Sequence, residues 1–202
     1  MGYIAIVDYG VGNLKSVSNA LKYIGCESLV TADAGELERA DAIILPGVGA
    51  FPDAADKLRT PGLDKIVVEQ GEKKPVLGIC LGMQLLLQHG VEVRPCDGLG
   101  VVQGVCDRIP TSLKLPHIGW NSLSFYNQSP LFQGLEDGVY VYFVHSFSAQ
   151  QTDSAQVVAT TNYGVEVTAA VQNGNFFGCQ FHPEKSGEIG LHILKNFGEL
   201  NR

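Results

Sequence analysis

Cys80 is the residue of this sequence best suited to nucleophilic chemistry. It follows the apolar run Pro75–Ile79, which favours a buried strand, and precedes Leu81–His89, whose leucines, methionine and glutamines favour a helix. Gly78 and Gly82 lie two positions before and two positions after it. A sharp strand-to-helix turn leaves no room for side chains beside its central residue, so this spacing predicts a nucleophile elbow.

The elbow would hold the Cys80 thiol above the strand, at the first turn of a helix. Unpaired amides and the helix dipole at that point favour the thiolate over the thiol. The amide of Leu81 would point toward the oxygen of a carbonyl under attack. A cysteine in this position can equally be a small buried core residue. A histidine and a carboxylate elsewhere in the chain would favour the catalytic interpretation.

His182 and Glu184 provide that pair, in the stretch GCQFHPEKSG that closes an expected strand beginning at Asn175. Residues two apart in an extended segment project to the same side, and Pro183 between them cannot donate a ladder hydrogen bond. We therefore expect both side chains at the tip of the strand. His182 would take the thiol proton and return it to a leaving amine, while Glu184 would fix the orientation and tautomer of the ring. The simpler alternative is a surface histidine with an acid nearby.

The loop Pro46–Phe51 (PGVGAF) directly follows another buried strand. Gly47 and Gly49 allow backbone conformations that aim amides into a cleft, and this strand end should lie near the elbow. The amide of Val48 could then complete an oxyanion hole with that of Leu81. An ordinary glycine-rich turn is the alternative interpretation.

The first half of the chain alternates between strands and helices. Apolar runs and helical spacing predict strands at Tyr3–Asp8, Cys26–Thr31 and Ala42–Leu45, and helices at Leu14–Ile24, Leu37–Ala40, Asp53–Arg59 and Leu63–Gln70. Such alternation implies a parallel sheet with helices on both faces.

The second half, from about residue 91 to 182, consists mostly of short alternating or apolar runs between turn residues. Asn173 and Gly174 are a strong hairpin signal inside VEVTAAVQNGNFFGCQF. Ser186 could cap a last helix that runs through Phe197. We expect an α/β fold: an open, mostly parallel or mixed sheet flanked by helices, with an antiparallel, strand-rich second half. Because no linker or repeat is visible, a single domain should span residues 1–202.

Composition excludes several classes of function. The net charge is −7, and no basic cluster exceeds Lys73 and Lys74, so a nucleic-acid partner is not expected. The first residues, MGYIAIVDYG, lack the basic flank of a signal peptide, and no apolar run reaches membrane-spanning length. Five cysteines at scattered spacings indicate reduced thiols in the cytoplasm, and a lone CxxH at Cys179 and His182 does not predict a zinc site. We expect no metal and no cofactor.

The elbow GICLGMQ, the loop PGVGAF and the closing segment HPE together resemble the class I, or triad-type, glutamine amidotransferases, in which the same pieces occur in the same order. Three more stretches, DYGVGNL at Asp8–Leu14, LPHIGWN at Leu115–Asn121 and YFVHSF at Tyr142–Phe147, are similar to one branch of that family. This branch comprises the glutaminase subunits of imidazole glycerol phosphate synthase in histidine biosynthesis. The resemblance spans nearly the whole chain.

The resemblance implies a role for each matching residue. Cys80 would be the nucleophile, His182 and Glu184 would complete the triad, and the Val48 and Leu81 amides would form the oxyanion hole. The positions implied for substrate binding are Gly47, Gly49, Gln84, Glu92, Ser146 and Phe147. Glu92 falls where the family often has an acidic residue that binds the substrate's α-amino group, but the local pattern departs, since many members carry Ser-Glu-Glu where this chain has Gly90, Val91 and Glu92.

The implied reaction is hydrolysis of glutamine to glutamate and ammonia through a glutamyl thioester on Cys80. The implied partner is a (β/α)8-barrel cyclase, bound as a heterodimer, which receives the ammonia through a tunnel. Trp120, the sole tryptophan, lies beside His117 and Asn121, and an aromatic anchor among polar groups suits an interface. Asn13 is a further interface candidate by resemblance. A single tryptophan can also be a core residue with one polar contact.

Two other functions remain open from the sequence. A glutaminase of this family could serve another acceptor, as in the vitamin B6 or anthranilate pathway, although LPHIGWN and YFVHSF favour the histidine branch. A thiol sensor or scaffold could share the fold without catalysis. A sensor thiol needs neither His182 nor Glu184, so their presence favours an enzyme.

Overall fold

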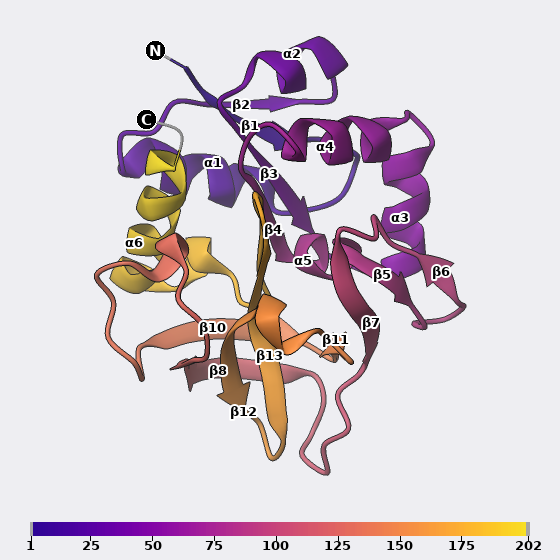
Figure 1. The fold of residues 1–202 in the computed structure, drawn as a ribbon, viewed down its shortest axis with the longest axis vertical. Coiled ribbons are helices and arrows are strands. Elements are labelled where there is room, and N and C mark those ends of the chain that lie inside the picture. Colours follow the sequence, from indigo (N-terminus) through magenta and orange to yellow (C-terminus); the bar gives the residue numbers. More distant parts are fainter. Residues whose placement is uncertain (1, 201–202) are drawn as a thin grey trace.

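An eight-stranded mixed sheet forms the centre of the computed structural model, which describes residues 2–200 (Figure 1). Its strand order is β2-β1-β3-β4-β14-β13-β12-β9. The strands are β1 (Ile4–Val7), β2 (Ser28–Thr31), β3 (Ala42–Gly47), β4 (Val76–Cys80), β9 (Ser124–Phe125), β12 (Val157–Asn162), β13 (Glu166–Asn173) and β14 (Phe176–Cys179). The helices are α1 (Leu14–Tyr23), α2 (Ala34–Arg39), α3 (Phe51–Arg59), α4 (Leu63–Gly71), α5 (Leu81–Leu85) and α6 (Gly187–Glu199).

The direction of pairing changes at β14. From β2 through β1, β3 and β4 to β14, each strand is parallel to the next. From β14 through β13 and β12 to β9, each strand is antiparallel to the next. Both halves of the chain therefore share one sheet, and β14 joins them by pairing with β4 on one side and β13 on the other. The predicted turn at Asn173 and Gly174 connects β13 to β14, and Gly174 has the positive φ that such a turn requires.

Two hydrophobic cores cover the two faces of the sheet. Figure 1 shows α1 and α6 on one side and α2, α3 and α4 on the other. Successive residues of β1 alternate between them: Ile4 and Ile6 belong to the core with α1 and α6, and Ala5 and Val7 to the core with α2 to α4. This is the arrangement expected for parallel strands buried on both faces.

Two smaller sheets complete the second half. Strands β8 (His117–Ser122) and β10 (Tyr140–His145) form an antiparallel ribbon. A four-stranded sheet has the order β11-β7-β5-β6, from β5 (Leu87–Gly90), β6 (Cys96–Asp97), β7 (Val102–Arg108) and β11 (Phe147–Gln150). Short 3-10 turns lie at Pro130–Phe132 (η1), Ser154–Gln156 (η2) and Pro183–Lys185 (η3). Within residues 2–200, no helix has the length and apolarity needed to cross a membrane.

The predicted helix Leu81–His89 is wrong beyond its first turn. Helix α5 ends at Leu85, and the chain then becomes strand β5, which pairs with β6 and β7. Leu85, Leu86 and Leu87 are all buried, at 1%, 0% and 0% exposure. Three consecutive buried side chains do not fit one face of a surface helix, so burial and strand pairing override the helix propensity of leucine and glutamine.

The predicted cap of the last helix is confirmed in its position but not in its side-chain hydrogen bond. Ser186 does precede α6, but its hydroxyl makes no capping bond. Instead, Ser186 Oγ donates to the His182 carbonyl at 2.7 Å and accepts the Tyr142 amide at 3.0 Å. The Ser186 side chain therefore ties the segment after β14 to β10, while its carbonyl begins the helix by accepting the Gly190 amide at 3.1 Å.

The elbow depends on Gly82, which offers a first prediction. A Cβ at this position would lie 1.8 Å from the Leu45 carbonyl oxygen of β3. Because both groups are backbone, neither can move aside, and we expect Gly82→Ala to lower the free energy of unfolding by about 3 kcal/mol. Urea unfolding followed by circular dichroism measures the change.

Gly35→Ala is the matched control. There the nearest atoms to a new Cβ are side-chain atoms of Arg39 and Asp33 at 3.2 Å. Alanine also favours the helical conformation of α2, so we expect a change within about 1 kcal/mol. If Gly82→Ala were as stable as Gly35→Ala, the close packing of the elbow against β3 would not be a constraint.

Candidate active site

Cys80 lies at the junction of β4 and α5, as the sequence predicts, in a rare backbone conformation. Its φ is 54° and its ψ −109°, which non-glycine residues seldom adopt. The strain is typical of a nucleophile elbow. Helix α5 has only five residues. The unpaired amides of its single turn therefore act on Cys80, without the dipole of a long helix.

Glycines allow the elbow and the neighbouring loop to approach closely. A Cβ at Gly78 would lie 2.6 Å from the Gly82 carbonyl oxygen. Gly47 pairs with Cys80 across β3 and β4, and a Cβ there would lie 2.9 Å from the Gly82 nitrogen and from the Tyr9 hydroxyl oxygen. The loop that follows β3 therefore leaves the sheet beside the cysteine, as we expected.

The Tyr9 side chain makes a hydrogen bond to the start of this loop, a contact that the sequence did not predict. Its hydroxyl donates to the Pro46 carbonyl at 2.6 Å, and its ring is buried at 6% exposure. Burial raises the pKa of Tyr9, and the nearby Cys80 raises it further, so the phenol stays protonated and remains a donor. The start of the PGVGAF loop is thus fixed by a hydrogen bond from the segment that follows β1.

His182 and Glu184 form a direct pair, but not for the predicted reason. Strand β14 ends at Cys179, and Glu184 lies in the 3-10 turn η3 that begins after His182. This turn, rather than an extended strand, brings Glu184 Oε1 to 2.8 Å from His182 Nδ1. Both side chains are buried, at 3% and 1% exposure.

The His182–Glu184 pair has two buried atoms whose hydrogen-bonding capacity is unused. Among residues 2–200, neither His182 Nε2 nor Glu184 Oε2 has a hydrogen-bond partner, although both atoms are buried. Burial lowers the pKa of His182, but the interactions with Cys80 and Glu184 outweigh it and raise the pKa to about 9. An imidazole that is held at Nδ1 and open at Nε2 beside a thiol is the arrangement of a general base.

A cleft of about 320 Å³ brings the predicted groups together. Its lining includes Cys80 and His182 of the predicted triad and most of the predicted oxyanion and substrate positions, namely Val48, Gly49, Leu81, Gln84, Glu92, Ser146 and Phe147. Glu184 lies behind His182, and Gly47 lies in β3 beside Cys80. Pro116, Val144, His145 and Lys185 also line the cleft and were not assigned to it from the sequence.

Gln84 is held rigidly at the wall of the cleft. Its Nε2 donates to the Phe147 carbonyl at 3.0 Å and to Gln180 Oε1 at 3.1 Å. Gln180, which is fully buried, in turn donates from its Nε2 to Cys80 Sγ at 3.8 Å. Sequence reasoning missed Gln180, although its place two residues before His182 was a signal. Because both hydrogens of the Gln84 amide are used, its oxygen is the atom left to accept from a substrate.

Glu92 reaches the cleft and also supports a helix. Its Oε2 accepts the Phe51 amide at 2.8 Å, at the first residue of α3. A carboxylate at that end of a helix is favourable because the first amides of the helix have no partners within it. The other carboxylate oxygen is the one that could contact an amino group in the cleft.

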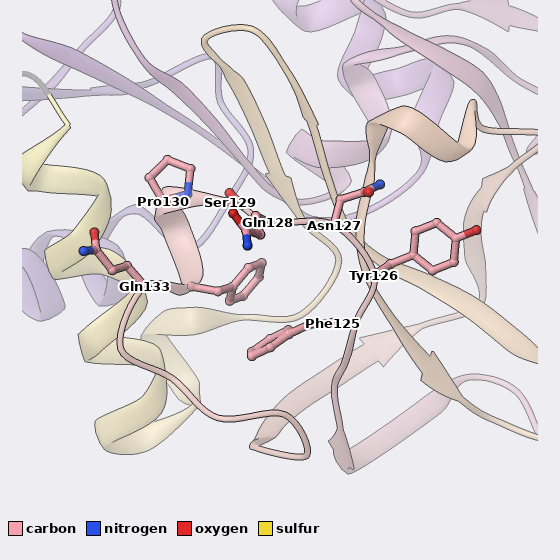
Figure 2. Close-up of a pocket in the computed structure, with 8 residues that line it drawn as sticks. Phe125, Tyr126, Asn127, Gln128, Ser129, Pro130 and Gln133 are labelled. Carbon is pink, nitrogen blue, oxygen red and sulfur yellow. The ribbon is translucent and has the colours of Figure 1, made fainter.

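A second cavity, of about 560 Å³, is not the reaction site (Figure 2). It is formed by β9 and the segment that follows it through η1, and it is lined by Phe125, Tyr126, Asn127, Gln128, Ser129, Pro130, Phe132 and Gln133. No cysteine, histidine or charged side chain is among these residues. The side chains able to catalyse a reaction lie in the smaller cleft, not in this larger cavity.

The predicted interface residues occupy different environments. Trp120 is 52% exposed on β8, with its ring edge against Tyr142 on β10. Asn13 and Asn121 are half-buried. His117 is only 1% exposed, so its side chain cannot contact a partner and instead packs inside the ribbon. The outer face of the ribbon also carries Ile118 and Tyr140, at 58% and 60% exposure.

Chemically, the cleft can perform acyl transfer. It combines a thiol, a base oriented by a carboxylate, and a strand-end loop that lies beside the thiol. Among residues 2–200, no cluster of three or more histidine, cysteine or acidic side chains is placed to hold a metal ion.

Sequence comparison finds close relatives along nearly the whole chain. A family model described as "Glutamine amidotransferase class-I" matches residues 5–200. A Bacillus cereus protein named imidazole glycerol phosphate synthase subunit HisH is 52% identical over 195 residues, which cover 96% of this chain and 93% of that protein. A protein of the same name from Caldanaerobacter subterraneus subsp. tengcongensis is 50% identical over 200 residues, 98% of each chain.

Solved structures share the architecture. One described as a glutamine amidotransferase has a TM-score of 0.76 at 22% identity, covering 98% of this chain and 100% of that chain. PurLQS from Thermotoga maritima has a TM-score of 0.74 at 23% identity, covering 97% of both. At these identities the likeness concerns the fold alone, and it confirms the α/β fold class predicted from the sequence.

The strained backbone of Cys80 leads to a prediction about stability. Glycine adopts a positive φ at little cost, whereas alanine does not. We therefore expect Cys80→Gly to be more stable than Cys80→Ala by about 1 kcal/mol, because the unfavourable conformation costs alanine more than glycine loses in chain entropy. Thermal unfolding of the two variants tests this, and a more stable Cys80→Ala would mean that the elbow is not strained.

His145 gives a second prediction, on pH. Burial lowers its pKa to about 4 in the folded protein, from 6.5. Between these values the unfolded chain binds the extra proton, so the contribution of His145 to stability is complete above pH 6.5 and is lost as the pH falls toward 4. The loss should be up to about 3 kcal/mol.

We expect His145→Asn to show a smaller fall in unfolding free energy between pH 6.5 and 4 than the unchanged protein. Denaturant titrations at several pH values measure the difference between the two. The pKa of His182 is raised, so its contribution to stability is present below pH 6.5 and is lost as the pH rises toward 9. It therefore does not affect the comparison between pH 6.5 and 4. Equal slopes in both proteins between pH 6.5 and 4 would contradict the buried, neutral state of His145.

Proposed function

The chain belongs to the class-I glutamine amidotransferase family, and we propose that it is the glutaminase subunit of an imidazole glycerol phosphate synthase. Two relatives that carry this name are 52% and 50% identical along nearly their full length. The observation that carries the catalytic part of the proposal is the buried His182–Glu184 pair, whose ring nitrogen Nε2 is unpartnered within residues 2–200, in the same cleft as Cys80.

The proposed reaction begins with glutamine in this cleft. Cys80 Sγ attacks the side-chain amide carbon while His182 holds the thiol proton, and the amides of Val48 and Leu81 stabilise the oxyanion. The proton on His182 passes to the leaving ammonia, and a thioester forms. Water, deprotonated by His182, then attacks the thioester carbon. The carbon–sulfur bond breaks, glutamate is released, and His182 returns the proton to Cys80 Sγ. Glu184 keeps the ring in the orientation that both steps need.

Substrate recognition in this proposal uses the walls of the cleft. The Gln84 oxygen, the second oxygen of Glu92 and the backbone of Ser146 and Phe147 would bind the polar groups of glutamine. Their position in the lining of the cleft supports this assignment. Gly47 and Gly49 would give the loop after β3 the conformational range to aim the Val48 amide.

The proposed partner is a (β/α)8-barrel cyclase, which would receive the ammonia within a heterodimer. The exposed face of the β8–β10 ribbon supports a docking surface, since Ile118, Trp120 and Tyr140 form an apolar, partly aromatic stripe there. Asn121 lies on the same ribbon, and Asn13, at the start of α1, is a further candidate. His117 would support the surface from inside.

The remaining parts of the proposal are a single domain over residues 1–202, supported by a family match over residues 5–200, and a cytoplasmic location. Five cysteines at scattered spacings suit a reducing compartment. Among alternative acceptors, the names of the relatives support histidine biosynthesis over the vitamin B6 and anthranilate pathways. The His182–Glu184 pair counts against a thiol sensor.

Replacement of the nucleophile is the central test. We expect Cys80→Ala, assembled with the cyclase, to lose glutamine-dependent product formation by roughly a thousandfold or more. Product formation from ammonium salts should persist, because free ammonia does not need the thiol. Cys96→Ala, which changes a cysteine outside the cleft, should retain both activities. If glutamine still supports turnover in Cys80→Ala, the nucleophile is assigned wrongly.

Glu184→Gln tests the orienting carboxylate. The change keeps the size of the side chain but removes the charge that helps to raise the pKa of His182. We expect kcat for glutamine hydrolysis to fall by about two to four orders of magnitude, because the ring loses its fixed tautomer. Steady-state kinetics in the complex measure the effect, with Glu188→Gln in the first turn of α6 as the control. A loss of less than about tenfold would remove Glu184 from the catalytic machinery.

A further inference from the structure

A continuous chain of hydrogen bonds runs from the β8 strand to the cysteine. It consists of Asn121, His117, His145, the Phe147 carbonyl, Gln84 and Gln180, and we call it the histidine relay. The relay ends at Cys80 Sγ, 3.8 Å from Gln180 Nε2. His117 and His145 are buried, at 1% and 6% exposure, and the catalytic steps above use neither ring.

The Phe147 carbonyl is the point where the relay meets the substrate cleft. It accepts two hydrogen bonds, one from Gln84 Nε2 at 3.0 Å and one from His145 Nδ1 at 2.8 Å. A carbonyl oxygen can only accept, so His145 must carry a hydrogen on Nδ1. His145 therefore fixes the group that in turn fixes Gln84.

The same reasoning determines the hydrogen on His117. A neutral imidazole carries one hydrogen, so His145 Nε2 is an acceptor. It lies 3.1 Å from His117 Nδ1, which must then be the donor. His117 Nε2 is left as an acceptor, 3.1 Å from the side-chain oxygen of Asn121.

The contact between His117 and Asn121 lacks a hydrogen when both histidines are neutral. Asn121 Nδ2 donates to the Asn162 carbonyl at 2.8 Å, while its oxygen faces His117 Nε2. A neutral histidine pair has two ring N–H hydrogens. Three contacts each need one: His145 with the Phe147 carbonyl, His117 with His145, and His117 with the Asn121 oxygen. Either the pair gains a proton, or the Asn121 carboxamide turns its amino group toward His117 and gives up Asn162.

We propose that His145 and His117 are positioning residues of the glutaminase site, a neutral pair with both hydrogens on Nδ1, and that Asn121 is its adjustable end. The His145 hydrogen holds the Phe147 carbonyl, and through it Gln84, while the His117 hydrogen holds the His145 ring. Asn121 is half-buried and can rotate, whereas the contacts of the two rings are enclosed. If the pair gained a third hydrogen, His117 Nε2 would carry it and donate it to the Asn121 side-chain oxygen.

The surroundings of the pair favour the neutral form. Phe143 and Tyr163 stack on the His117 ring with centroids 4.8 and 4.0 Å away, and the Tyr163 hydroxyl donates to the Lys114 carbonyl. Burial lowers the pKa of both histidines, and His182 lowers that of His145 further. Cys80, Glu92 and Lys185 are the other ionisable groups among the residues that line the cleft with His145.

The hydrogen positions can be measured directly, without any activity assay. Protein labelled with 15N-histidine, in complex with the cyclase, gives long-range nitrogen–proton correlations that distinguish protonated from unprotonated ring nitrogens. At pH 7.5 we expect protonated Nδ1 and unprotonated Nε2 in both rings, assigned with His145→Asn and His117→Asn. A hydrogen on Nε2 of either ring, or an imidazolium at this pH, would overturn the proposal.

Asn121→Asp tests the adjustable end by the same measurement. A carboxylate cannot turn an amino group toward His117, so it should favour the third proton on the pair. We expect the imidazolium signal to appear at a pH at least one unit higher than in the unchanged protein. Asn162→Ala, which leaves the backbone carbonyl in place, is the control and should not move it. No shift in Asn121→Asp would mean that Asn121 does not share protons with the pair.

The positioning role rests on the proposed function and is tested by kinetics. The side-chain amide of asparagine can replace the Nδ1 donor of His145, whereas phenylalanine keeps the ring but not the donor. In the complex we expect His145→Phe to raise the KM for glutamine about fivefold or more, the effect of one lost hydrogen bond, and His145→Asn to restore it. Thermal unfolding of each variant separates this effect from misfolding.

The outcomes separate the two proposals. If the unchanged complex does not hydrolyse glutamine, the proposed function fails, and the nitrogen shifts still decide the state of the pair. If it does hydrolyse glutamine but His145→Phe and His145→Asn have the same KM, the pair is only structural and the positioning role is wrong.

Discussion

The close contact between the elbow and β3 is the constraint on which the site depends. Gly82 can lie against the Leu45 carbonyl only because it has no side chain, and Gly78 meets Gly82 in the same way. This contact sets Cys80 at a positive φ and brings it opposite Gly47, where the PGVGAF loop leaves the sheet. The nucleophile and the loop that would stabilise the oxyanion are therefore positioned by one packing interaction, between the first turn of α5 and β3.

The base is positioned by a different part of the chain. His182 donates its backbone amide to the Tyr142 carbonyl at 3.0 Å, and Ser186 connects the same two segments through its hydroxyl. Strand β10 thus holds the turn that carries both His182 and Glu184, while β14 fixes its start by pairing with β4. Because β4 also carries Cys80, the triad is assembled wherever β4 and β14 pair correctly.

The sequence predicts those parts of the site that depend on local spacing. Gly78 and Gly82 indicate the elbow, and His182 and Glu184 are close in the chain. The prediction from sequence is wrong where tertiary contacts determine the local structure. The turn η3 replaces the expected extended segment, and buried leucines end α5 after one turn. Tyr9 could not be found from spacing, because its role depends on a partner 37 residues away. Gln180 lies two residues before His182, but its contact with Cys80 spans 100 residues.

The unfavourable features of the structure are concentrated in the cleft. Cys80 is strained, and His182 Nε2 and Glu184 Oε2 are buried without partners among residues 2–200. Each of these costs stability, so each needs a surrounding structure that leaves it no alternative conformation. The glycine contacts, the Ser186 bridge and the hydrogen bonds of Gln84 supply that rigidity. A substrate that satisfies the open groups would recover part of this cost on binding, which favours the occupied cleft over the empty one.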